Sequence, residues 1–511
     1  MPGTSRRLVG AGIAASATVG PLTRSERARG MRRGRVMESS WGARVDTRNS
    51  VRRLATVTIA AIALLGLIAT APAGAKPTPA YILTDVGTFG GPQAFMNLPG
   101  EPLTRQGGVI GTADTSIPDE DFPNFNPFII GFPNPTIARA FVFKDGRLED
   151  LGALPGNNSS AVFQINGSGA GAGMSETPEI DPFTGWPVEH ATLFKNGRVI
   201  DLGSLPGGYE SQAISITDNG QVAGFAQNGI EDPFSIFGWG GEVRSFVWRD
   251  GQMTDIGTLG GPDAVMAFQN ARGQIVGDSY TDATPNETTG IPTIHPYLWT
   301  RGKMRDLGSF GGAFSQTNWV NDAGQVVGFA SLPGDEFVHP FLWDGARLRD
   351  LGTLGGTFGL AFHVNAAGHV VGLATMTDDA ALHAFLWKNG RMSDLSGADN
   401  PDCTVAESLN DHDQVVGHTC DETTALLWSG GKEYDLTSLA GPTDVQLTQA
   451  AAIDNQGRIV AVGLLPDGNQ RLFLLEPSRR TLPATSILRR GSHPSGMHAL
   501  IRRSTRIRTL R

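Results

Sequence analysis

The stretch RDLGTLGGTFGLAFHVNAAGHVVGLA, residues 349–374, decides the fold because close copies of it occur elsewhere in the chain. The copies are RDLGSFGGAFSQTNWVNDAGQVVGFA at 305–330 and TDIGTLGGPDAVMAFQNARGQIVGDS at 254–279. Each copy places branched and aromatic residues between glycine-rich turns. A repeated module of this kind predicts a repeat architecture rather than a chain of unrelated domains.

The repeat has a period typical of propeller blades. Aligning the chain on the aspartate that opens the quoted stretch gives Asp85, Asp150, Asp201, Asp255, Asp306, Asp350, Asp394 and Asp435. Most of these aspartates are separated by about 40–50 residues, the period of a blade with four strands.

Each period is interpreted as four short strands, named a to d. Strand a is exemplified by residues 315–321, strand b by 325–330, strand c by 339–343 and strand d by 391–395. Short runs rich in Val, Phe and Trp, bounded by Gly, Asn and Asp, favour strands over helices. We expect no helix after residue 75.

The order of the strands predicts how the chain ends meet. A d strand comes first, at residues 81–85, and a c strand comes last, at residues 471–475. The N-terminal strand would therefore complete the C-terminal blade and close the ring, which leaves no free sheet edge at the chain ends. The sequence predicts an all-β propeller of eight blades. A propeller of seven blades is the alternative, since the first unit is degenerate and carries an insertion.

The motifs HAFLW, DLGTLGG and NDAGQVVG together resemble the HAF-repeat family of bacterial extracellular proteins. The resemblance covers most of residues 81–475 and is strongest over 244–396. His383-Ala384-Phe385 matches the triplet that names the family, whereas the units at Arg139, Thr424 and Arg471 depart from it. The resemblance implies export and a repeat fold, and it implies no reaction.

Charge separates the chain into three parts. The extension 1–75 holds 12 Arg and 3 acidic residues, and the tail 476–511 holds 9 Arg and one Glu. The propeller segment 76–475 then carries 20 basic and 46 acidic residues, a net charge of −26. Such a body repels nucleic acid and anionic membranes. We expect its ligands to be neutral or cationic, with a carbohydrate or another cell-surface component as candidates.

The N-terminal extension contains an export signal. Arg52 and Arg53 precede an apolar run over residues 54–70, and Ala73 and Ala75 form an A-x-A pattern. This arrangement predicts a secreted protein cleaved after Ala75. The run is near the length of a membrane span, so an uncleaved anchor is the alternative. The basic tail 476–511 lacks apolar periodicity and is expected to be disordered.

Recurrent polar residues are interpreted as structural. Histidines recur once per unit at His190, His295, His339 and His383, and equivalent positions on separate blades cannot converge on one metal ion. The repeated aspartate is expected to bond backbone amides in the next turn, because catalysis needs one or two differently tuned groups. The turn NDAG lacks the carboxylates of a calcium loop. GSGAGAG at 167–173 lacks the lysine and helix of a phosphate loop. We therefore expect neither a cofactor nor a metal.

The two cysteines are predicted to form a disulfide. Cys403 lies near the start of a strand a and Cys420 near the end of the following strand b. Antiparallel pairing brings such positions together. The bond would contribute roughly 3 kcal/mol in the chain-entropy description.

The variable loops between strands b and c are the expected place of ligand recognition. They differ in length and sequence on a regular scaffold, where recognition usually resides. Acidic and aromatic side chains could bind a sugar or a cationic group there. The alternative is that these are solvated loops that serve solubility. The candidate binding residues are Asp335, Glu336, Asp378, Asp379, Asp421, Glu422, Trp186 and Trp239.

Two function classes follow. The favoured one is an exported binding or scaffold propeller without a reaction. The other is an extracellular carbohydrate-active hydrolase or lyase with its site at the propeller centre, which would require two carboxylates about 5–10 Å apart. Glu407, on a strand a, is the central carboxylate that the sequence identifies.

Overall fold

The chain folds as a β-propeller, and the structure is a computed structural model. It describes residues 80–478 except 98, 123, 125–133, 157, 238 and 398–402. The cleavage site at Ala75, the apolar run 54–70 and the tail beyond residue 478 lie outside the described residues. In the described part, no helix is long and apolar enough to cross a membrane.

Thirty-two strands in the described residues form eight antiparallel blades of four strands each. Blade 1 comprises β2 (Gly90–Phe95), β3 (Val109–Pro118), β4 (Thr136–Lys144) and β5 (Arg147–Gly152); blade 2 comprises β6 (Ser160–Ile165), β7 (Gly171–Ile180), β8 (Pro187–Lys195) and β9 (Arg198–Asp201); blade 3 comprises β10 (Ser211–Ile216), β11 (Val222–Glu231), β12 (Gly241–Arg249) and β13 (Gln252–Asp255); blade 4 comprises β14 (Ala264–Gln269), β15 (Ile275–Pro285), β16 (Pro292–Thr300) and β17 (Lys303–Asp306).

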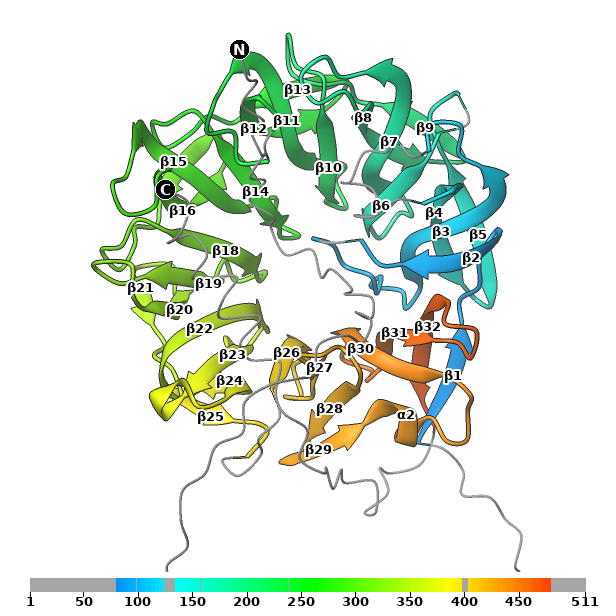
Figure 1. Cartoon of the computed structure of the whole chain (residues 1–511), viewed down its shortest axis with the longest axis vertical. Helices are drawn as coiled ribbons and strands as arrows, with labels where there is room; N and C mark the ends of the chain where they lie inside the picture. The colour runs from blue at the N-terminus through cyan, green and yellow to red at the C-terminus, as the bar shows by residue number, and fades with distance from the viewer. Residues whose placement is uncertain are drawn as a thin grey trace, which may run out of the picture. The chain divides into compact units, whose positions relative to one another are not determined.

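The other four blades follow the same order. Blade 5 comprises β18 (Ser315–Val320), β19 (Val326–Ser331), β20 (Val338–Trp343) and β21 (Leu348–Asp350); blade 6 comprises β22 (Gly355–Val364), β23 (Val370–Met376), β24 (Leu382–Lys388) and β25 (Arg391–Asp394); blade 7 comprises β26 (Thr404–Leu409), β27 (Val415–Thr419), β28 (Ala425–Ser429) and β29 (Lys432–Asp435); blade 8 comprises β30 (Gln446–Ile453), β31 (Ile459–Leu464), β32 (Gln470–Pro477) and β1 (Tyr81–Asp85). Figure 1 shows the blades following one another around a common centre, with each first strand innermost.

Strand β1 completes blade 8, as the sequence predicted. It pairs antiparallel with β32 over its full length, from Tyr81 opposite Pro477 to Asp85 opposite Phe473. Blade 8 also packs against blade 1, since Val460 and Leu472 share one apolar cluster with Ala94, Val109 and Phe141 of β2, β3 and β4. The pairing extends β32 to Pro477, so Glu476 and Pro477 belong to the propeller and not to the tail.

A bulge in the innermost strand explains the glycine of strand b. The pairing of β10 with β11 shifts between Ala213 and Ser215, and blades 2 and 4 to 8 shift at the equivalent place. At Gly224 an added Cβ would lie 1.9 Å from the carbonyl oxygen of Gln212. Glycine lets the bulged strand approach this closely in blades 2 to 7, whereas Ala461 occupies the position in blade 8.

In six of the eight blades the core is built on an aromatic residue in the middle of strand c, which Thr192 and Leu426 replace in blades 2 and 7. At most 1 % of each of these side chains is exposed, which makes them the principal inter-sheet packing groups: Phe141, Phe246, Tyr297, Phe341, Phe385 and Phe473. Burying an aromatic ring stabilises the fold by roughly 1.5–3 kcal/mol. The repeated F or Y of the sequence is therefore a packing position.

Asparagines at the a–b turns join successive blades. The side-chain amide of Asn270 donates to the carbonyl oxygen of Asn321 at 2.9 Å, Asn321 donates to Asn365 at 2.8 Å, and Asn365 donates to Asn410 at 3.1 Å. Asn410 continues the series to the carbonyl of Asp454 at 2.9 Å. The motif NDAG is thus a blade-to-blade connection as well as a tight turn.

The prediction of no helix was wrong in two short places. Leu436–Leu439 forms one α-helical turn, α2, capped by the Asp435 carboxylate, which accepts the backbone N–H of Thr437. Thr377–Asp379 forms a 3-10 turn, η1. Both are single turns in connections between strands, where a strand pattern carries no information.

Candidate functional site

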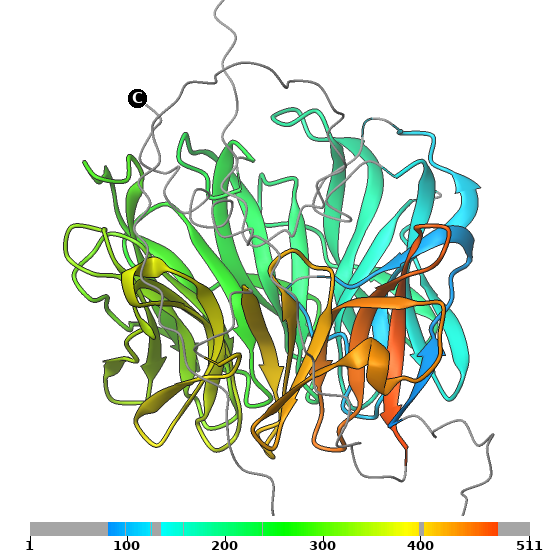
Figure 2. The same ribbon diagram turned by 60° about the horizontal axis from the view of Figure 1, so that its bottom comes forward.

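The b–c connections and the d–a links lie together on one face, which we call the loop face (Figure 2). This face is not uniform around the centre. In blades 1 to 4 strand b has 10 or 11 residues, as in β3, β7, β11 and β15, whereas β27 of blade 7 has five. The long strands raise their loops above those of blades 5 to 8.

Three of the predicted acidic ligands are engaged in local bonds. The Oδ1 atom of Asp335 accepts the backbone N–H of Ala313 at 2.7 Å, and that of Asp379 accepts the N–H of Thr357 at 2.7 Å. Asp421 accepts the hydroxyl groups of Thr419 at 2.6 Å and Thr423 at 2.9 Å. These carboxylates hold the loops in shape before any ligand arrives.

The remaining predicted residues are not brought together. Glu336 and Asp378 are exposed, on different blades, and Glu422 is half-buried beside His418. Trp186 is half-buried against the largest apolar cluster. The expectation that Trp239 faces a ligand is wrong. Its side chain is fully buried and packs on Phe225 and Phe237, with ring centroids 5.9 and 5.1 Å away.

Apolar side chains are instead exposed on blades 1 to 3, a region we call the crest. It consists of Ile117, Phe122, Ile180, Phe183 and Ile230, each 40–55 % exposed. The loops touch one another: the amide of Asn124 donates to the carbonyl of Gly185 at 3.2 Å, and the Phe183 ring lies 6.1 Å from the ring of Tyr209. The acidic residues Asp119, Glu120, Asp121, Glu179 and Glu231 flank them. Neighbouring exposed apolar groups with a polar rim mark interaction sites.

Buried carboxylates anchor the loops of the crest. Asp263 accepts the backbone N–H groups of Ile236 at 2.7 Å and Val243 at 2.8 Å, and Asp181 accepts that of Phe183 at 2.7 Å. Burial raises the pKa of Asp263 to about 8, although these hydrogen bonds lower it and neighbouring acids raise it. The pKa of Glu176 rises to about 7, also mainly through burial.

A second feature of the loop face is a polar groove of about 390 Å³ between blades 4 and 5. Its walls come from the b–c loop of blade 4, the d–a link and the b–c loop of blade 5. The lining includes Asn286, Thr288, Thr293, His295, Ser309 and Asp335. The sequence identified Asp335 but not the groove, because three separate segments form it.

Histidine and aspartate pair within each blade that carries both, and the sequence analysis missed this. Nδ1 of His190 lies 3.0 Å from Asp201, and His339 pairs with Asp350 at 2.9 Å. His295–Asp306 and His383–Asp394 repeat the pair. Burial raises the pKa of these aspartates, but the hydrogen bond and charge of histidine, together with backbone N–H groups, outweigh burial and hold each pKa below its usual value. The constant spacing of 11 residues was the available signal.

Each recurrent histidine thus bonds to the recurrent aspartate of its own blade. Oδ1 of Asp201 also accepts the N–H of Gly203 at 2.7 Å, as expected for the DLG aspartate. In blade 3 Arg244 takes the place of histidine, 3.8 Å from Asp255. Within the described part of the chain, no group of three or more His, Cys, Asp or Glu could hold a metal ion.

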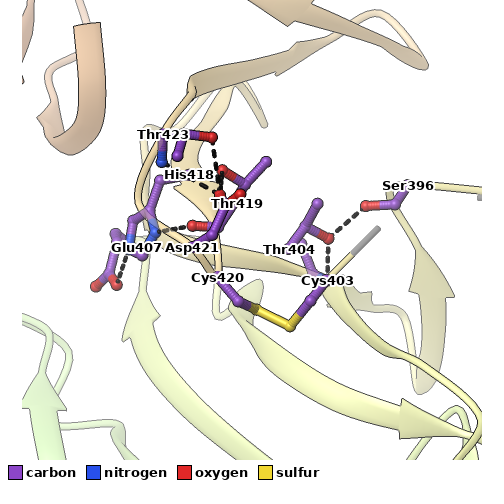
Figure 3. The surroundings of a disulfide bond; sticks show 10 residues. Ser396, Cys403, Thr404, Glu407, His418, Thr419, Cys420, Asp421 and Thr423 are labelled. Carbon is purple, nitrogen blue, oxygen red and sulfur yellow. Dashed lines mark hydrogen bonds and ion pairs between the residues drawn. A yellow bond between two sulfur atoms is a disulfide. The ribbon is translucent and has the colours of Figure 1, made fainter. Parts of the chain in front are cut away.

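The disulfide lies in blade 7 (Figure 3). Cys403 and Cys420 are bonded, with their Cα atoms 5.3 Å apart, and they flank strands β26 and β27. Beside them Nε2 of His418 lies 3.1 Å from Glu407, and Nδ1 donates to the carbonyl of Thr419 at 2.8 Å. Burial lowers the pKa of His418, but the hydrogen bond and charge of Glu407 outweigh it and raise that pKa. Glu407 is therefore paired, not isolated.

Comparison with known proteins yields the fold alone. No family model matches the chain, and no curated protein matches it. Among solved structures it is similar to the β-propeller domain of the trilobed protease from Pyrococcus furiosus, at 9 % identity and a TM-score of 0.39, covering 80 % of this chain and 98 % of that one. It is also similar to Porphyromonas gingivalis dipeptidyl peptidase 4, at 10 % identity and a TM-score of 0.43, covering 76 % and 60 %. A third similar structure is an ulvan lyase, at 11 % identity and a TM-score of 0.33, covering 78 % of this chain and 96 % of that one. Likenesses this distant carry no argument about function.

Proposed function

We propose that the chain is an exported, non-catalytic binding propeller of HAF-like repeats that recognises its ligand on the loop face. The crest is the single observation that carries this proposal. Its five exposed apolar side chains lie at the ends of the long b strands (Ile117, Ile180 and Ile230) and in the b–c connections (Phe122 and Phe183). Buried carboxylates hold the connections of blades 2 and 3, so this surface is preformed there and binding would cost little ordering entropy.

The chemistry of the crest limits its ligand. Aromatic rings such as Phe122 and Phe183 stack on apolar sugar faces and attract cations. The flanking acids and the net charge of −26 over 76–475 disfavour anions. A neutral or cationic glycan, or a cationic cell-surface polymer, fits these properties.

Binding of full-length protein to immobilised glycans and peptidoglycan fragments tests the proposal. The variant F122A/F183A should weaken binding about tenfold, equal to roughly 1.4 kcal/mol. Leu464→Ala is the matched control, because Leu464 is also exposed, at 37 %, but lies on blade 8. Unchanged binding by F122A/F183A, or an equal loss in the control, would overturn the crest as the site.

The acidic rim is tested separately. Replacing Glu120, Asp121 and Glu231 with their amides removes three charges without changing shape. Affinity for a cationic polymer should fall and its salt dependence should diminish. If affinity and salt dependence both persist, the acids serve solubility only.

The Glu407–His418 pair favours a second candidate, a carbohydrate-active hydrolase or lyase with its site at the centre. A carboxylate hydrogen-bonded to an imidazole is a usual acid–base arrangement. Glu407→Gln should then abolish polysaccharide cleavage by full-length protein while glycan binding persists. Absence of cleavage by the unmodified chain across neutral and anionic polysaccharides counts against this candidate.

A further inference from the structure

The groove between blades 4 and 5 is distinct from the crest and contains two polar groups oriented toward a ligand. The first is His295. Its Nδ1 lies 3.1 and 3.0 Å from the two carboxylate oxygens of Asp306, and a carboxylate only accepts, so Nδ1 carries the proton. In the neutral ring, Nε2 is then left as an acceptor, and His295 is one of the residues that line the groove.

The second group is the Asp335 carboxylate. Its hydrogen bonds differ from those of the equivalent Asp379 in the next blade. In blade 6 Asp379 uses Oδ1 for the N–H of Thr357 and Oδ2 for the hydroxyl of the same threonine, both at 2.7 Å. In blade 5 the residue equivalent to Thr357 is Ala313. Asp335 therefore uses only Oδ1, for the Ala313 N–H and the Ser331 hydroxyl. Its Oδ2 is available to accept a hydrogen bond from a ligand.

The rest of the groove supplies hydroxyl and amide groups rather than apolar surface. Thr288, Thr293, Ser309 and Asn286 can each donate and accept, and Gly311, Gly312 and Gly334 are also part of the lining. At Gly312 an added Cβ would lie 2.2 Å from the Ser331 hydroxyl oxygen, so only glycine fits between the link and the b–c loop of blade 5. Such a wall suits a ligand that offers many hydroxyl groups. It contains one acidic group and no lysine or arginine.

We propose that this groove binds a neutral sugar, one or two rings in length, whose hydroxyl groups donate to Nε2 of His295 and Oδ2 of Asp335. The volume of about 390 Å³ lies at the small end of ligand sites. An anionic sugar would meet the Asp335 carboxylate and the acidic body, so uronates are excluded. The groove uses no residue of the crest, so an experiment can refute one binding site without refuting the other.

The test is binding of N,N′-diacetylchitobiose, cellobiose, maltose and digalacturonate to full-length protein, followed by saturation-transfer NMR and calorimetry. At least one neutral disaccharide should bind at millimolar concentration, and digalacturonate should not. Asp335→Asn keeps the bond to Ala313 but removes the free acceptor, and should weaken binding about tenfold.

Asp379→Asn is the matched control, because it makes the same chemical change at the repeat-equivalent position whose second oxygen is occupied. It should bind as the unmodified chain does. Thr288→Trp, on an exposed loop residue, should block the groove without disturbing the core. Absence of binding by any neutral disaccharide would overturn the proposal. So would equal effects of Asp335→Asn and Asp379→Asn, or a loss only in F122A/F183A, which would place the sugar on the crest.

Discussion

A hydroxyl group at the start of the innermost strand joins neighbouring blades. Ser211 accepts the backbone N–H of Ala191 on blade 2 at 2.8 Å, and Thr404 accepts that of Ala384 on blade 6 at 3.0 Å. In both cases the donor is the second residue of the motif that begins with histidine. The alanine of HAF is thus matched to a hydroxyl group two strands later in the chain, at the start of the next blade.

Proline removes this bond, and the partner position changes with it. After Pro296, which has no N–H, Ser315 stands at the hydroxyl position with no hydrogen-bond partner for its Oγ. After Pro340 the position is Gly359, where an added Cβ would lie 2.9 Å from the proline ring. Alanine is thus followed by a hydroxyl group that accepts its N–H, whereas proline is followed by a serine without a partner or by glycine, and a single aligned column does not show this relation.

We predict opposite effects of one substitution at two equivalent serines. Ser211→Ala leaves the buried N–H of Ala191 unpaired and should lower the free energy of unfolding by about 1–3 kcal/mol. Ser315→Ala removes a buried hydroxyl that has no partner, and should be neutral or slightly stabilising. Chemical denaturation of both variants measures this. Equal losses would show that the hydroxyl acts through packing and not through the bond.

Single residues also mark where sequence reasoning ends. The interval of 11 residues between His and Asp was visible and could have predicted the pairs. The burial of Trp239 could not have been predicted, because it depends on the conformation of a loop that occurs once. Likewise, Asp335 and Asp379 occupy equivalent positions, four residues after Ser331 and Thr375, and their contacts with Ala313 and Thr357 distinguish them.

At the scale of elements, blades 1 to 4 differ from the rest through their long b strands. The extended ends of β7 and β11 need support, and buried carboxylates provide it by accepting backbone N–H groups. Glu210 accepts the N–H of Glu189 on β8 at 2.9 Å, and the amide of Gln212 donates to Glu189 at 3.1 Å. Strand boundaries were predictable from the repeat, but these supports were not, since they occur only in the blades that depart from it.

These supports place several buried carboxylates close together between blades 2 and 3. Burial raises the pKa of Glu189, and the neighbouring carboxylates of Glu210 and Glu176 raise it further, against the hydrogen bond from Gln212 that lowers it. A raised carboxyl pKa means that the folded chain binds more protons than the unfolded one. The contribution of Glu189 to stability is therefore greatest below its ordinary pKa of about 4.3 and falls as pH rises.

Glu189→Gln should remove part of this pH dependence. The amide cannot ionise and can donate toward Glu210, so the variant should be more stable than the unmodified chain near pH 8 and equal near pH 4. Each extra proton held by the folded state changes the free energy of unfolding by about 1.4 kcal/mol per pH unit. Thermal unfolding across this pH range measures the difference. Glu120→Gln, at an exposed position, should show no such trend, and a parallel trend there would refute the assignment to Glu189.

At the scale of the molecule, the architecture was the most predictable feature. The period and the number of d strands predicted the propeller, its eight blades and the use of residues 81–85 to complete the last one. Repetition makes this possible because each copy repeats the same sequence pattern. The candidate binding sites could not be predicted in this way. The crest and the groove are formed by loops that occur once, from segments distant in sequence, so neither could be assembled from the repeat.

Completion of blade 8 by β1 gives the last prediction. Without residues 80–85, β32 becomes an unpaired edge, and the cluster around Phe473 loses the buried ring of Tyr81, which is 3 % exposed. Unpaired edges promote association between chains. Deletion of this strand should lower the free energy of unfolding by about 3–5 kcal/mol, as for loss of a buried aromatic group, and should cause aggregation on heating.

A synthetic peptide of residues 79–87 should restore the unfolding temperature by re-forming the pair between β1 and β32. Ile82→Ala should have little effect, because Ile82 is 55 % exposed on the same strand. A deletion variant that stays monomeric and melts at the original temperature would show that blade 8 is stable with three strands.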